Sequence, residues 1–331
     1  MSINGIPEID QHLLSNVIYV REPCHNNIFK QGSLEPNYDF IKYLSASGKI
    51  PVIDFSIEHW GHGYTIDYTY QILQENFSKF VIMTHHPDDH LKQPNLVFYP
   101  YWNFVTRKRF NFLKDIDDLP RTYKASCLNQ KPRPHRILNF FYLQQKPYAS
   151  NCFFRINNPS NFVNDPNVQE IPEKISKWWD NYSQTLDLVP LFDAWYHART
   201  LDKTLLAFTD TYVNIVTETN VSPRIFVTEK TWKAIACGQF FIIFGNPGTV
   251  QHLRDLGVDT YDDIIDHNYY DQEQDWTLRL EKIHEIIDKT MTLDLEKLWK
   301  QTLTRRRLNR MKFLKGDLVL KYKEILLQKI L

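Results

Sequence analysis

Residues 211–257 read TYVNIVTETNVSPRIFVTEKTWKAIACGQFFIIFGNPGTVQHLRDLG, and strand and helix signals alternate along this stretch. Two apolar runs of strand length alternate with two segments of helical spacing, in the order 211–217, 228–237, 239–244 and 249–256. Gly238 and Gly257 directly follow the two helical segments, where a left-handed residue commonly ends a helix. The order strand, helix, strand, helix predicts an α/β fold.

The same alternation extends upstream. The expected elements there are strands at 49–56, 80–84, 95–99 and 123–128 and helices at 65–77 and 136–145. An acidic, proline-containing stretch at 114–120 is the best candidate for a linker, and an amphipathic helical tail begins near Asp275. Because 331 residues suit two domains of roughly 150 residues each, we expect an N-terminal domain at 1–118 and a C-terminal domain at 119–331.

The composition favours a soluble cytoplasmic protein whose overall net charge does not attract nucleic acid. Lys+Arg and Asp+Glu both number 39, so binding to DNA or to an anionic membrane would need a local patch. The cysteines lie far apart without metal spacing, as expected of reduced thiols in a cytosol-like compartment: Cys24, Cys127, Cys152 and Cys237. The first residues lack the pattern of a signal peptide, and no apolar run approaches the roughly 20 residues that span a bilayer.

Polar residues gather where the helix at 228–237 begins. Thr228 is placed to cap it, Glu229 and Lys230 follow in its first turn, and Arg224 stands just before it. A helix N-terminus favours phosphate, and Arg and Lys add positive charge, so this group could neutralise a nucleoside diphosphate. Glu229 would accept hydrogen bonds from ribose hydroxyls. An ordinary solvated first turn explains the same residues equally well from spacing alone.

Several segments resemble the donor-binding half of GT-B glycosyltransferases, and most of all the fucosyltransferase-like group with its uncharacterised bacterial and phage-encoded relatives. The matching segments are CLNQKPRPHR (127–136), NIVTET (214–219), IFVTEKTWK (225–233), FFIIFG (240–245) and LRDLG (253–257). The resemblance covers roughly residues 123–290. It implies two Rossmann-like domains that face a central cleft, with the donor sugar nucleotide in the C-terminal one.

The resemblance also implies roles for single residues in the donor half. Glu229 and Lys230 match the pair that contacts the ribose and the phosphates in the family, and Arg224 matches a basic residue only approximately. Arg133 and Arg136 match basic residues that face the diphosphate, although a solvated turn is the alternative.

The resemblance raises two further points, one about Glu218 and one about a segment that differs from the family pattern. Glu218 lies at a strand end near the same cleft, or is a structural acid that pairs with an arginine. The chain departs from the family pattern at DHNYYD (266–271), where relatives read Asp-Glu-Ser-Tyr-Asp.

Candidates for the catalytic base follow the first N-terminal strand. The stretch SIEHWGHG (56–63) places Glu58, His59 and His62 at the carboxyl end of that strand, where open α/β sheets bind ligands. A carboxylate or imidazole there could take the proton of an acceptor hydroxyl. Glu58 resembles a glutamate of the family, while a capping acid beside surface histidines is the alternative.

Two rival functions come from other classes of protein. The stretch THHPDDH (84–90), with His85 to His90, could bind a divalent metal and make the chain a hydrolase, or could simply be a polar loop. A non-catalytic nucleotide or sugar binder is the third class.

The basic stretch from Arg305 to Arg310 could hold an anionic acceptor such as DNA, or form a solvated helix face.

Taken together, the sequence predicts a glycosyltransferase that moves a sugar from a nucleoside-diphosphate sugar to a hydroxyl of a glycan or a modified nucleobase. Arg224 and Lys230 would stabilise the leaving diphosphate, so no metal or other cofactor is expected to be essential.

Overall fold

The computed structural model describes residues 9, 15–21, 28–29, 35–56, 63–87, 93–110, 118, 120–129, 133–156, 207–221 and 224–331. The chain divides into two compact units. The first unit comprises Met1–Asn111, Arg224–Glu229 and Lys312–Leu331, and the second comprises Phe112–Pro223 and Lys230–Met311. No helix in the described ranges is long and apolar enough to cross a membrane.

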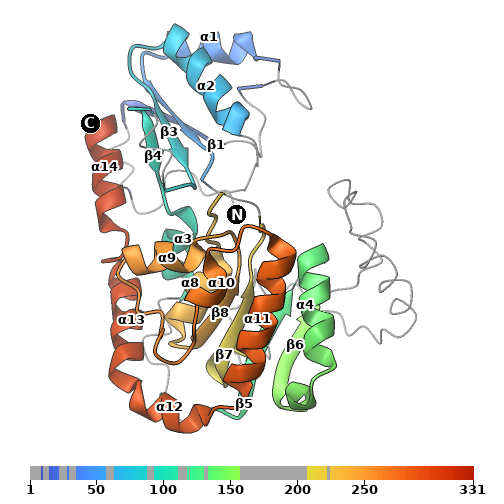
Figure 1. Cartoon of the computed structure of the whole chain (residues 1–331). Helices are drawn as coiled ribbons and strands as arrows, with labels where there is room; N and C mark the ends of the chain where they lie inside the picture. Colours follow the sequence, from blue (N-terminus) through green and yellow to red (C-terminus); the bar gives the residue numbers. More distant parts are fainter. Residues whose placement is uncertain are drawn as a thin grey trace. The chain divides into compact units, whose positions relative to one another are not determined.

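The first unit is built on a parallel four-stranded sheet in the order β1-β2-β3-β4 (Figure 1). Its strands are β1 (Val17–Arg21), β2 (Ile50–Asp54), β3 (Val81–Thr84) and β4 (Leu96–Phe98). Its helices between and after the strands are α1 (Tyr38–Ala46), α2 (Gly63–Asn76) and α3 (Tyr101–Phe110). Val20, Ile53, Ile82 and Leu96 pair in one line across the sheet, and all four are buried in the core of the unit. The strands are apolar on both faces because helices cover parallel sheets on both sides.

The last helix of the chain belongs to this first unit. Helix α14 (Leu320–Ile330) packs against β4, and the rings of Tyr322 and Phe98 meet edge to face with centroids 4.6 Å apart. The turn before it contains Gly316, which has a left-handed φ of +82°. A Cβ at this position would lie 1.5 Å from Nη1 of Arg107 on α3, so a larger residue would require the end of that side chain to move.

The second unit contains a parallel sheet in the order β6-β5-β7-β8. Its strands are β5 (Tyr123–Asn129), β6 (Cys152–Ile156), β7 (Thr211–Thr217) and β8 (Phe240–Phe244). The chain moves outward from β5 to β6 and in the opposite direction from β7 to β8, so the order reverses between β5 and β7. Right-handed crossovers therefore place α4 (Pro134–Gln144) and α8 (Glu229–Ala236) on opposite faces. Open α/β sheets bind ligands at the carboxyl ends of the strands next to such a reversal.

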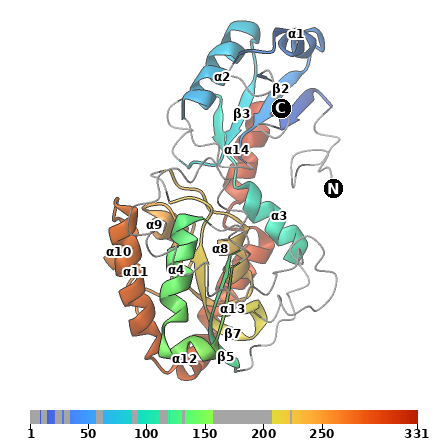
Figure 2. The same ribbon diagram turned by 90° about the vertical axis from the view of Figure 1, so that its right-hand side faces the viewer.

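Further helices cover the second sheet and continue the chain. They are the 3-10 helix η4 (Pro147–Asn151) and the helices α9 (Thr249–Asp255), α10 (Asn268–Asp271), α11 (Trp276–Met291), α12 (Leu295–Gln301) and α13 (Leu303–Lys315). Helix α11 packs on β8 and lies beside α4, as Figures 1 and 2 both show. Every residue of β7 and β8 is buried. This covered sheet explains why β8 is continuously apolar in the sequence.

The prediction of an α/β fold with parallel sheets is confirmed. The strands and helices predicted along 211–257 are present, and Gly238 and Gly257 have the expected positive φ. The predicted helical tail begins as expected, because Asp275 caps α11 by accepting hydrogen bonds from the N–H groups of Thr277 and Leu278. The sequence pattern missed β1, α1, α3, β6 and α10, which lie among residues with weak periodicity.

Candidate functional site

The candidate site lies at the carboxyl ends of β5 and β7, where the strand order of the second sheet reverses. The hydroxyl of Thr217, the last residue of β7, donates to the side-chain oxygen of Asn129, the last residue of β5. The Asn129 amide in turn donates to Sγ of Cys127, 3.3 Å away. All three side chains are buried, so hydrogen bonds between side chains fix the two strand ends relative to each other.

Glu218, the residue after β7, connects the loops that surround this reversal. Its carboxylate oxygen Oε1 accepts a hydrogen bond of 2.7 Å from the Thr231 hydroxyl in the first turn of α8. Its backbone carbonyl accepts from Nη2 of Arg136 and lies 3.0 Å from Nε2 of His135 on α4. Its backbone N–H donates to the carbonyl of Phe244 at the end of β8. Glu218 is therefore bonded to α4, which follows β5, to α8, which follows β7, and to the last residue of β8.

The imidazole of His135 is neutral, and its pKa is lowered by burial and by nearby positive charges. Burial lowers its pKa well below the ordinary value, and the charges of Arg136, Arg133 and Lys230 lower that pKa further. The neutral ring donates from Nε2 to the carbonyl of Glu218, which fixes its tautomer. Arg133 and Arg136 stand three residues apart at the start of α4, Arg136 bonds the Glu218 carbonyl, and the Lys230 ammonium lies 3.9 Å from the Glu218 carboxylate. The three cations therefore form a cluster beside His135.

Two cations of this cluster are partly exposed and one is buried. Arg133 occupies the N-cap position of α4, where its side chain makes no capping hydrogen bond. The Lys230 side chain is 17% exposed, and its ammonium lies 3.2 Å from the Thr219 hydroxyl and 3.9 Å from Oε2 of Glu218. Arg136 is buried and bonds the protein's own backbone. The predicted roles of Arg133 and Arg136 at a diphosphate remain predictions.

A further arginine supports the loop after β7 and was missed in the sequence. Arg279 on α11 is buried, donates to the Val221 carbonyl at 2.8 Å, and lies over the ring of Phe244. Burial lowers its pKa to about 10. Arg279 falls at helical spacing with the buried Ile283 and Ile286. A charged residue on the apolar face of a predicted helix was the signal that could have identified it.

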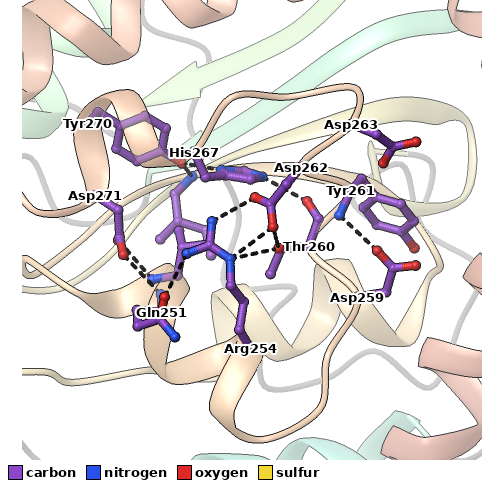
Figure 3. A network of polar contacts seen from close by, with 12 residues as sticks. Gln251, Arg254, Asp259, Thr260, Tyr261, Asp262, Asp263, His267, Tyr270 and Asp271 are labelled. Carbon is purple, nitrogen blue, oxygen red and sulfur yellow. Dashed lines mark hydrogen bonds and ion pairs between the residues drawn. The ribbon is translucent and has the colours of Figure 1, made fainter.

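The helix that follows β8 already holds its own anion. The carboxylate of Asp271 accepts hydrogen bonds of 2.8 and 2.9 Å from the backbone N–H groups of Val250 and Gln251 in the first turn of α9 (Figure 3). Burial raises the pKa of Asp271, and these two N–H donors oppose that rise. This helix start is therefore satisfied by the protein's own carboxylate, and the cationic side of the edge lies around α4 and α8.

The segment 266–271, which departs from the family pattern, forms an internal network (Figure 3). Nε2 of His267 lies 2.9 Å from the Thr260 carbonyl, and Nδ1 lies 2.7 Å from the Tyr270 hydroxyl. The same hydroxyl accepts a hydrogen bond from the backbone N–H of Ile243 in β8. Burial lowers the pKa of His267 to about 4, so the ring is neutral at physiological pH. Segment 266–271 therefore stabilises β8 through the hydrogen bond between Tyr270 and Ile243.

The remaining donor candidates lie in the segment Arg224–Glu229, which counts with the first unit. Helix α8 begins at Glu229, directly after Thr228, as predicted. Thr228 is buried, whereas Arg224 and Glu229 are partly exposed. Their roles at the ribose and the phosphates remain predictions.

The predicted catalytic bases Glu58, His59 and His62 lie outside the described residues. The strand before them ends at Asp54, a buried carboxylate that accepts hydrogen bonds from the N–H and hydroxyl of Ser56. Their assignment as bases remains a prediction.

Only the start of the histidine-rich stretch at 84–90 is described. His85 is buried, with Nδ1 3.3 Å from the Phe55 carbonyl and its ring edge-on to Phe226. His90 lies outside the described residues. Within the described ranges, no group of three or more His, Cys, Asp or Glu residues could hold a metal ion.

The basic stretch from Arg305 to Arg310 pairs with acids of its own unit. Arg305 forms ion pairs with Asp259 and Asp263. Asp118 forms ion pairs with the three other arginines of the stretch, Arg306, Arg307 and Arg310. These pairs attach α13 to residue 118 and to the loop at 259–263, so the stretch has a structural role in the second unit.

Comparison with protein-family models, with curated proteins and with solved structures gave no match. What the described residues show is a parallel α/β sheet whose strand order reverses between β5 and β7, with Arg133, Arg136 and Lys230 clustered at that reversal.

Proposed function

We propose that this chain is a glycosyltransferase of the GT-B type that binds a nucleoside-diphosphate sugar at the carboxyl edge of its second sheet. The supporting observation is the cluster of Arg133, Arg136 and Lys230, whose charges together lower the pKa of the buried His135. A diphosphate carries the opposite charge, and the cluster lies where open α/β sheets bind nucleotides. The resemblance of residues 123–290 to donor-binding domains supports the same assignment.

The chemistry asked of this site is stabilisation of a leaving group. When the bond from the sugar to the diphosphate breaks, negative charge grows on the phosphate oxygen. Lys230 offers a compact charge with several donors, and Arg133 offers a planar fork suited to two phosphate oxygens. Cations held in place before the reaction stabilise that growing charge without reorganising. In this proposal the sugar passes to an acceptor hydroxyl, whose proton goes to Glu58, His59 or His62.

The first experiment is a screen of nucleoside diphosphates for a rise in the melting temperature, followed by calorimetry with the best ligand. A ligand at about 100 times its dissociation constant should add about 2.7 kcal/mol to stability. Lys230→Ala should weaken the affinity roughly tenfold or more, because a hydrogen bond to a charged group is lost. Lys300→Ala is the matched control, since Lys300 is an exposed lysine of the second unit that pairs with Glu296.

The outcomes separate the possible functions. Unchanged nucleotide affinity in Lys230→Ala would refute the assignment of the site. If the wild type binds a nucleoside diphosphate but transfers no sugar to any acceptor, the non-catalytic binder is the better description. Substitution of Glu58 by Gln should abolish transfer and leave nucleotide affinity intact if Glu58 is the base.

A further inference from the structure

Glu218 cannot fulfil the donor-contacting role predicted for it while its carboxylate is in the position observed. The side chain has no exposed surface, and Oε1 is bonded to the Thr231 hydroxyl. A ribose hydroxyl would have to displace that bond and uncover the group. The geometry points to a different role for this residue.

The surroundings of Glu218 hold it rigidly beside Lys230. Its backbone is bonded on both sides, through the N–H to Phe244 and through the carbonyl to Arg136. The Cβ and Cγ of Glu218 lie next to Gly245, where an added Cβ would approach them to 3.5 Å. A carboxylate anchored in this way defines a fixed point from which a neighbouring cation can be oriented.

Two contacts orient the Lys230 ammonium: the Glu218 carboxylate attracts it, and it donates a hydrogen bond to the Thr219 hydroxyl. The distance of 3.9 Å from Nζ to Oε2 is too long for a hydrogen bond but short enough for strong attraction. Thr219, the next residue, places its hydroxyl 3.2 Å from the same ammonium. Thr231, directly after Lys230, bonds the Glu218 carboxylate and so fixes the first turn of α8.

We propose that Glu218 is a positioning residue that acts through Thr231 to hold the ammonium of Lys230 toward the diphosphate, without touching the nucleotide itself. This inference rests on the proposed function of the site. It predicts that the Thr231 hydroxyl, which bonds the Glu218 carboxylate, contributes to nucleotide affinity only while Lys230 is present.

The test is a double-mutant cycle in nucleotide binding, measured by calorimetry with the nucleoside diphosphate that binds the wild type best. Thr231→Val keeps the shape of the side chain and removes the donor, and should weaken affinity about fivefold. Thr231→Ser keeps the hydroxyl and should restore affinity. In the Lys230→Ala background, Thr231→Val should cause no further loss.

A matched control uses the neighbouring helix. Thr249 is a buried threonine in the first turn of α9, and its hydroxyl donates to the Asn246 carbonyl. Thr249→Val should leave nucleotide affinity unchanged, because the anion of that helix start is Asp271.

Three results would overturn the inference in distinguishable ways. Additive losses in the double variant, or full affinity in Thr231→Val, would refute the positioning role and leave the proposed function standing. Failure of the wild type to bind any nucleoside diphosphate would refute the proposed function and this role together.

Discussion

Acidification should weaken the second unit through His267, whose ring is buried between the Thr260 carbonyl and the Tyr270 hydroxyl (Figure 3). The neutral ring donates from Nε2 to the carbonyl and accepts at Nδ1 from the hydroxyl. A proton added at Nδ1 would break the second of these bonds and bury a charge. Burial outweighs the nearby carboxylates of Asp262 and Asp266, and the pKa falls from the ordinary 6.5 to about 4.

The magnitude follows from the difference between the folded and unfolded states. Between these two pKa values the unfolded chain binds a proton at His267 and the folded chain does not, so stability falls as the pH falls. Each pH unit in that window costs about 1.4 kcal/mol. On going from about pH 7.5 to about pH 5, His267 alone should therefore remove roughly 2 kcal/mol of stability.

The assay is urea unfolding of the wild type and of His267→Gln at a series of pH values over this range. The variant should be less stable at neutral pH, yet its loss of stability on acidification should be smaller by about 2 kcal/mol. Tyr269→Phe is the control: Tyr269 is exposed and lies in α10, the helix that begins directly after His267, so this variant should keep the slope of the wild type. Equal slopes in the wild type and His267→Gln would refute the reasoning.

Two further predictions concern a glycine turn and a buried ion pair. Gly316→Ala should destabilise the first unit by roughly 1–2 kcal/mol, because a φ of +82° strains the backbone of an alanine while the end of the Arg107 side chain can move aside. Gly48→Ala, in open space with a similar positive φ, should cost about as much in thermal unfolding, and a much larger loss in Gly316→Ala would show that the Arg107 guanidinium cannot move aside. Asp118→Ala should cost roughly 3–5 kcal/mol, since it leaves the buried Arg306 without its carboxylate. Urea unfolding at two salt concentrations measures this loss, and a change below about 1 kcal/mol would show that Asp118 is not the anchor.

The elements of the fold could be predicted well wherever their signal is local. The segment from β7 to α9 has apolar strands, helical spacing and glycines at helix ends, and each of these follows from the preferences of residues close in sequence. The short strand β6 could not be identified in the same way, because its five residues gain their stability from pairing with β5.

The candidate site could be predicted only as a list of charged residues. Arg133, Lys230 and Glu218 were singled out, but the sequence could not show that Glu218 is buried or that Arg136 bonds a backbone carbonyl. Burial depends on which neighbours cover a side chain, and here those neighbours come from α4, α8 and β8. The importance of Arg279, far along the chain, depends on the same long-range packing.

Local sequence was enough to predict the alternation of strands and helices, the starts of α8 and α11, and the glycine that ends α8, because backbone preferences and capping act within a few residues. The strand order, the reversal between β5 and β7 and the cationic cluster beside His135 became visible only in the folded chain. These depend on pairing and burial between distant segments, where desolvation and charge act through space.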